Sequence, residues 1–259
     1  MNGTMILAAC LVALTGAVRS HSPRDNDDIS RGRPSGKSAP KTVLIGKVSF
    51  EGKPSPPKDL KIEPSQQKSC QHDGKMDMTD RSLLIARDGG LANVVVTIDV
   101  EGMKPSMPKE PVVLDNRGCR FEPHVLVIPV GAQLKFKNSD PTSHNIHTYS
   151  KRTSSINKTI PPGSEVAHAI KRSEAFSVQC DIHPWMQGWI FATDAPFSAV
   201  TGPDGSFSID GLPAGDYEAK LWHERLGRLT QSFTITEREP TEVEWNMGQQ
   251  KKSKKRRRR

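Results

Sequence analysis

The stretch SVQCDIHPWMQGWIF (177–191) places Cys180, His183 and Met186 at three-residue intervals. The segments on either side of this triplet, AFSVQC (175–180) and GWIFATD (188–194), have the composition and end signals of strands. The three side chains are therefore expected on one tight loop between strands. A thiol, an imidazole and a thioether are soft ligands that suit a transition metal. Taken alone, Cys-x-x-His is also half of a zinc site, and a buried free cysteine is ordinarily a small apolar residue.

The rest of the chain repeats this strand-like pattern. β-branched, alternating runs end at Gly, Pro, Asn or Asp, and no stretch keeps a helical periodicity over three turns. The sequence therefore predicts an all-β protein. The other predicted strands are 42–50, 91–100, 112–115, 124–130, 133–138, 164–170, 206–211, 216–223 and 230–237.

The basic charge of the chain lies at its end. The formal net charge is +8, and the last nine residues, KKSKKRRRR, contain eight Lys and Arg, so the remainder is neutral (8 − 8 = 0). We expect residues 248–259 to be a disordered polybasic tail. It would bind an anionic envelope polymer, lipid headgroups or an acidic partner, or would simply be solvated. A neutral body predicts no nucleic-acid binding.

The amino-terminal residues predict export. Residues 1–20 contain an apolar run of signal-peptide length, with cleavage expected after Ala17 or Ser20, and polar residues 21–41 read as a flexible linker. A lipoprotein signal ending at Cys10 and an N-terminal strand are the alternatives. Export places the protein in the periplasm or cell envelope, where thiols oxidise.

Signal removal would leave three of the four cysteines, which is an odd number. We expect Cys180 to be the cysteine that stays unpaired. The other two, Cys70 and Cys119, are then expected to form a disulfide that clamps the turn-rich segment 51–82. The alternative is a second metal site that combines these two cysteines with His72 and His124.

The stretch FKNSDPTSHNIHTYS (136–150) supplies a further imidazole, His144, 36 residues before Cys180. Two imidazoles, one thiolate and a weak thioether are the ligand set of a blue-copper electron-transfer site. CDIHPWM (180–186), GAQLKFKN (131–138) and SHNIH (143–147) together resemble the amicyanin- and plastocyanin-like members of the cupredoxin family. Ser143 stands where that family commonly has Pro. The resemblance covers about 80 residues, and it implies a Greek-key β-sandwich.

The resemblance also implies residue roles. His144, Cys180, His183 and Met186 would bind one type 1 copper, with Met186 axial, and Asn145 would tie the two ligand loops together. A partly exposed His183, framed by Pro184 and Trp185, would be the electron port. His147 would lie either beside the ligands or on a solvent-facing strand position.

The function implied is a single-electron carrier between transient donor and acceptor proteins. No nucleophile elbow, carboxylate pair or phosphate loop occurs in the sequence, so we expect no enzyme. Two rivals stay open: a copper-binding or copper-buffering protein without a redox partner, and a structural or adhesive module that copper merely stabilises.

A second resemblance concerns the segments around this region. IGKVSFEGKP (45–54), LANVVVTID (91–99) and TGPDGSFSIDGLPAGDYEAKLWHE (201–224) resemble the carboxypeptidase regulatory-like family of transthyretin-like β-sandwiches. About a hundred residues separate the second and third of these segments. We therefore predict that the cupredoxin-like domain, 111–196, is inserted into a sandwich formed by 42–110 and 197–247. Two tandem domains are the alternative.

Overall fold

The structure is a computed structural model that describes residues 42–53, 55–70, 76–237 and 239–248. All of these residues belong to one unit, 40–259. The predicted signal peptide, the linker, His72 and the tail beyond Gly248 lie outside them. None of the helices in the described ranges has the length and apolar character needed to cross a membrane.

The prediction of an all-β fold is confirmed, since the described residues form sixteen strands and a single short helix. The helix, α1 (Pro64–Ser69), was not predicted. It starts with Pro64 in its first turn, a position that proline favours. Its six residues are too few to produce a readable helical period.

Two sheets enclose the first hydrophobic core, and we call them the central sandwich. One sheet has the order β5-β11-β10-β7-β8 and the other β4-β3-β6-β9. Leu134 and Phe136 from one sheet meet Ile146 and Val178 from the other in a shared core. The bounds are β3 (Val112–Asn116), β4 (Phe121–Glu122), β5 (Val125–Pro129), β6 (Gln133–Asn138), β7 (His144–Thr148), β8 (Asn157–Ile160), β9 (Glu165–Ala169), β10 (Glu174–Gln179) and β11 (Gln187–Thr193).

Two further sheets form the flanking sandwich around a second core that includes Leu44, Ile98 and Trp245. Their orders are β13-β1-β16 and β12-β2-β14-β15. The bounds are β1 (Val43–Phe50), β2 (Val95–Ile98), β12 (Phe197–Val200), β13 (Ser206–Asp210), β14 (Gly215–His223), β15 (Gly227–Ile235) and β16 (Thr241–Met247).

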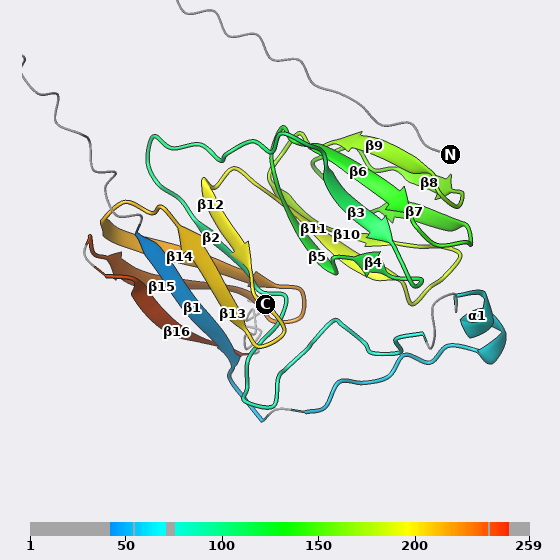
Figure 1. The fold of residues 1–259 in the computed structure, drawn as a ribbon, viewed down its shortest axis with the longest axis horizontal. Helices are drawn as coiled ribbons and strands as arrows, with labels where there is room; N and C mark the ends of the chain where they lie inside the picture. The colour runs from blue at the N-terminus through cyan, green and yellow to red at the C-terminus, as the bar shows by residue number, and fades with distance from the viewer. Residues whose placement is uncertain (1–41, 54, 71–75, 238, 249–259) are drawn as a thin grey trace, which may run out of the picture. The chain divides into compact units, whose positions relative to one another are not determined.

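The strands of the flanking sandwich come from both ends of the described chain. β1 pairs with β13 in antiparallel and with β16 in parallel orientation, so strands distant in sequence lie side by side (Figure 1). All strands between β3 and β11 pair only among themselves in these sheets. This pairing is the one that an inserted domain requires, and the domain boundaries themselves stay a prediction.

The PDG turn before β13 depends on a backbone conformation that glycine favours. Gly205 has φ +81°, and a Cβ placed there would lie 2.3 Å from the carbonyl oxygen of Val48. The Asp204 carboxylate accepts a hydrogen bond from the Ser206 backbone N–H at 3.0 Å. The turn thereby brings β13 back against β1.

Candidate metal centre

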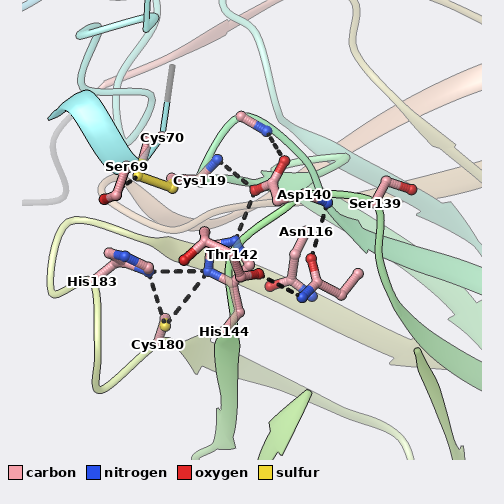
Figure 2. Close-up of polar contacts among 12 residues, drawn as sticks. Ser69, Cys70, Asn116, Cys119, Ser139, Asp140, Thr142, His144, Cys180 and His183 are labelled. Atoms are coloured by element: carbon pink, nitrogen blue, oxygen red, sulfur yellow. Dashed lines mark hydrogen bonds and ion pairs between the residues drawn. A yellow bond between two sulfur atoms is a disulfide. The ribbon is translucent and has the colours of Figure 1, made fainter. Parts of the chain in front are cut away.

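Three predicted ligand side chains meet at one end of the central sandwich. His144 begins β7, Cys180 directly follows β10, and His183 lies in the loop before β11. Cys180 Sγ lies 4.0 Å from His144 Nδ1 and 3.8 Å from His183 Nδ1, and the two nitrogens are 3.0 Å apart (Figure 2). An ion about 2.0–2.3 Å from each of three such atoms fits these separations. The donor set therefore fits a single soft metal ion.

The loop between Cys180 and β11 is closed by its own backbone. The Met186 N–H donates to the carbonyl of His183 at 2.8 Å, and the Cys180 N–H donates to the carbonyl of Met186 at 3.2 Å. The Met186 side chain is buried in the same core as Cys180. The tight loop thus fixes the relative positions of the thiol and the imidazole. The axial role of Met186 stays a prediction.

Asp140 is a functional residue that the sequence reasoning missed. Its carboxylate receives the His144 Nε2 proton at 2.7 Å and the backbone N–H groups of Gly118 and Cys119 at 2.6 and 2.8 Å (Figure 2). A proton held on Nε2 leaves Nδ1 of His144 free to bind a metal. The aspartate four residues before the histidine in SDPTSH was the available signal.

The surroundings favour the thiolate form of Cys180. Burial raises the pKa of the thiol, but its contacts with the His144 and His183 imidazoles and the hydrogen bond from the Asn145 backbone N–H outweigh it and lower the pKa from 9.0 to about 6. The thiolate is the form of cysteine that binds metals. The same contacts therefore prepare Cys180 as a ligand near neutral pH.

Asn145 connects the two ligand-bearing segments. Its backbone N–H donates to Cys180 Sγ at 3.2 Å, and its side-chain Oδ1 accepts from the Asp181 N–H at 3.2 Å. Its Nδ2 donates to the Asn157 Oδ1 at 2.6 Å. These bonds hold the start of β7 against the end of β10.

His147 lies on the solvent side of this network. Its Nδ1 is 3.0 Å from a carboxylate oxygen of Asp181, and its ring stacks on Tyr149 with centroids 4.3 Å apart. Its side chain is 29% exposed. Of the two placements expected for His147, the structure shows the partly exposed strand position, in contact with the neighbour of Cys180.

A disulfide joins Cys70 and Cys119 beside the candidate site. The two sulfur atoms and a ring nitrogen of His183 all lie within 4.8 Å of one another, and Figure 2 shows the bridge next to the ligand group. Both cysteines are oxidised in this arrangement, so they offer no thiolates. His124 is paired with Glu224 instead. These three residues therefore do not support the alternative of a second metal site, and its fourth member, His72, lies outside the described residues.

The covering of His183 differs from the expectation. Its side chain is 5% exposed, whereas the resemblance implied a partly exposed imidazole. Its recorded neighbours account for this burial: the Cys70–Cys119 disulfide, whose sulfur atoms lie within 4.8 Å of one of its ring nitrogens, and the Trp185 ring, with centroids 5.1 Å apart. The expected exposure is wrong. The electron-port role of His183, Pro184 and Trp185 remains a prediction.

Comparisons with known proteins give structural neighbours only. No family model matches the chain, and no curated protein sequence matches it. A copper-containing nitrite reductase from Thermus scotoductus is 22% identical, with a TM-score of 0.32 over 38% of this chain and 25% of the reductase. A purple cupredoxin from Nitrosopumilus maritimus is also 22% identical, with a TM-score of 0.28 over 32% of this chain and 99% of its own.

A variant of amicyanin in the Cu(I) state is 17% identical, with a TM-score of 0.31 over 38% of this chain and 98% of its own. The chain thus spans about a quarter of the nitrite reductase that it matches. Similarities this low do not assign the chain to a family or a role, which must be argued from the site itself.

Proposed function

We propose that this protein binds one type 1 copper through His144, Cys180, His183 and Met186 and carries single electrons between redox partners. The observation that supports this most is the convergence of one thiol sulfur and two Nδ1 atoms within 3.0–4.0 Å in a buried site. The resemblance of the ligand segments to cupredoxins supports the same assignment.

The protein's own residues perform three tasks in this proposal. Asp140 holds the Nε2 proton of His144, the lowered pKa supplies Cys180 as a thiolate, and the closed Cys180–Met186 loop fixes the donor positions. Copper bound there would supply the one-electron redox couple. Donor atoms held at fixed positions reorganise little when an electron moves, which suits a carrier better than an enzyme.

Burial of the site favours the carrier over a copper buffer. His144, Cys180 and His183 are at most 5% exposed, and the disulfide lies against His183. A buffer must exchange its metal readily, and a covered site exchanges slowly. We also infer an exported protein, because a disulfide persists in oxidising compartments. Weak, transient redox partners and an anionic target for the basic tail belong to the same proposal.

The test is voltammetry of the copper-loaded full chain with a chelator present. The carrier predicts a reversible one-electron wave that survives many cycles without loss of copper. Cys180→Ser is expected to abolish that wave. Transfer of the metal to the chelator in either oxidation state during cycling would instead support the buffer and refute the carrier.

A further inference from the structure

A cavity of about 420 Å³ lies beside the loop that carries His183, and nothing in the proposed function uses it. Pro184, Trp185 and Trp189 contribute to its wall. The volume falls in the range of sites that bind small molecules, roughly 300–1,000 Å³. Two indole rings in the wall suit a flat aromatic ligand, because aromatic pairs favour offset or edge-to-face contact.

The wall of this cavity also contains Arg120 and Arg225. Arg120 is 8% exposed, and its Nη2 donates to the backbone carbonyls of Asp77 and Thr79. Arg225 is exposed, and its guanidinium donates to the Ser82 hydroxyl at 3.4 Å. Arg120 also pairs with the Asp77 carboxylate, 3.5 Å from its Nε. The bond recorded for Arg225 ends on a neutral oxygen, so its positive charge is the less compensated of the two.

The two carboxylates in the same wall, those of Asp80 and Glu224, already accept hydrogen bonds from protein groups. Glu224 pairs with His124 through one oxygen and accepts from Trp189 Nε1 at 2.9 Å through the other. Asp80 accepts the Ser82 N–H at 2.9 Å. A third guanidinium, that of Arg81, also lines the cavity and is paired with carboxylates outside the wall. Among the described residues, Arg225 is therefore the guanidinium of this wall that forms no ion pair, and it is the cation open to a ligand.

The electrostatics of the wall agree with this account. Burial and the neighbouring Arg81 charge lower the pKa of Arg120. Burial raises the pKa of Asp80, but its bonds to Ser82 and the positive charge of Arg225 lower it overall. Because burial is the main cause at Arg120, and Asp77, Glu122 and Asp80 act against it, only the shift of Asp80 reports on a nearby positive charge, that of Arg225.

Trp185 links the cavity to the candidate metal centre. Its ring centroid lies 5.1 Å from that of His183. Its Nε1 is buried without a hydrogen-bond partner in the described part of the chain. A molecule seated against this indole would thus be one ring away from a ligand of the metal.

We propose that this cavity binds a small aromatic carboxylate, with its ring against Trp185 and its carboxylate facing Arg225. Arginine guanidinium groups suit this task because they bind carboxylates in a planar, bidentate manner. The binding itself requires no metal. Only its consequence, that the bound molecule lies next to the electron-carrying centre, rests on the proposed function.

The test uses the copper-free full chain with ¹⁵N-labelled indoles, titrated with 4-hydroxybenzoate. The chain has four tryptophans, which give separate indole signals. We expect saturable shifts at Trp185 and Trp189, while Trp245, in the core of the flanking sandwich, stays unchanged. Loss of one charged hydrogen-bond donor through Arg225→Gln is expected to weaken binding by about tenfold or more.

The matched control is Arg228→Gln, which removes another exposed arginine that is not part of this wall. It is expected to bind 4-hydroxybenzoate like the unmodified chain, and neutral 4-hydroxybenzamide is expected to bind weakly. No saturable shift, equal weakening by Arg228→Gln, or equal binding of the amide would overturn the proposal.

The same samples separate this inference from the proposed function. Binding in the copper-free chain, together with an ordinary copper spectrum after loading, would support the cavity and refute the electron carrier. A type 1 spectrum without any shift of the Trp185 signal would support the electron carrier and refute the cavity proposal.

Discussion

Removal of the disulfide that lies against His183 gives the sharpest stability prediction. The bridge closes a loop with a sequence separation of 49 residues. In the chain-entropy treatment, the unfolded chain of Cys70→Ala/Cys119→Ala gains about 4 kcal/mol of conformational freedom at 25 °C for a loop of this length. The central sandwich of the variant is therefore expected to be less stable by that amount.

Hydrogen exchange reports this loss locally. A change of about 4 kcal/mol corresponds to roughly a thousandfold faster exchange of amides that exchange through opening of the central sandwich. The amides of β6 and β10 are expected to show it, while those of β14 and β15 in the flanking sandwich keep their protection. Ser69→Ala, beside the bridge, is the control and is expected to change little. A loss below about 1 kcal/mol in the double variant would refute the reasoning, because ordinary substitutions reach that size.

Three further perturbations test separate parts of the structure. Asp140→Asn is expected to lower the free energy of unfolding by about 2 kcal/mol, since it removes a buried carboxylate that accepts hydrogen bonds from His144 Nε2 and from the Gly118 and Cys119 N–H groups; unchanged stability in urea would contradict this. In the copper-free protein the ultraviolet thiolate absorbance of Cys180 is expected to titrate near pH 6, below its ordinary 9.0. Because that pKa is lowered on folding, the thiolate's contribution to the free energy of unfolding is complete above pH 9.0 and disappears as the pH falls through about 6. An absorbance midpoint near pH 9 would contradict the contacts described around Cys180. Gly205→Ala is expected to lower the free energy of unfolding by about 2 kcal/mol or more. The control is Gly211→Ala, which has a similar φ of +79° and no atom within 4 Å of the new Cβ, so it measures the cost of the backbone conformation alone. Equal losses in the two variants would show that the close approach to Val48 costs nothing.

Local patterns predicted much of this fold and site. The alternation in QLKFKN predicted β6, because inward positions 134 and 136 must be apolar to fill the core. The spacing of Cys180, His183 and Met186 predicted that they share one loop. Strands end just before this segment and begin just after it, so the loop is short and its residues stay close together.

The features that were missed depend on contacts between distant segments. The Cys70–Cys119 disulfide lies beside His183, and the sequence near the histidine contains no sign of this contact with distant residues. The pair between His124 and Glu224 joins residues 100 positions apart. Asp140 is close to His144 in sequence, but a turn aspartate has many other uses, so its hydrogen bond became visible only with the side chains placed.

The central claim is that the Cys180 thiolate and two imidazoles bind one copper ion. The most direct measurement is the visible and EPR spectrum of the full chain with one equivalent of Cu(II), recorded beside that of Cys180→Ser. We predict an intense thiolate-to-copper band and a narrow copper hyperfine splitting, both absent from the variant. A pale spectrum that the substitution leaves unchanged would contradict the claim.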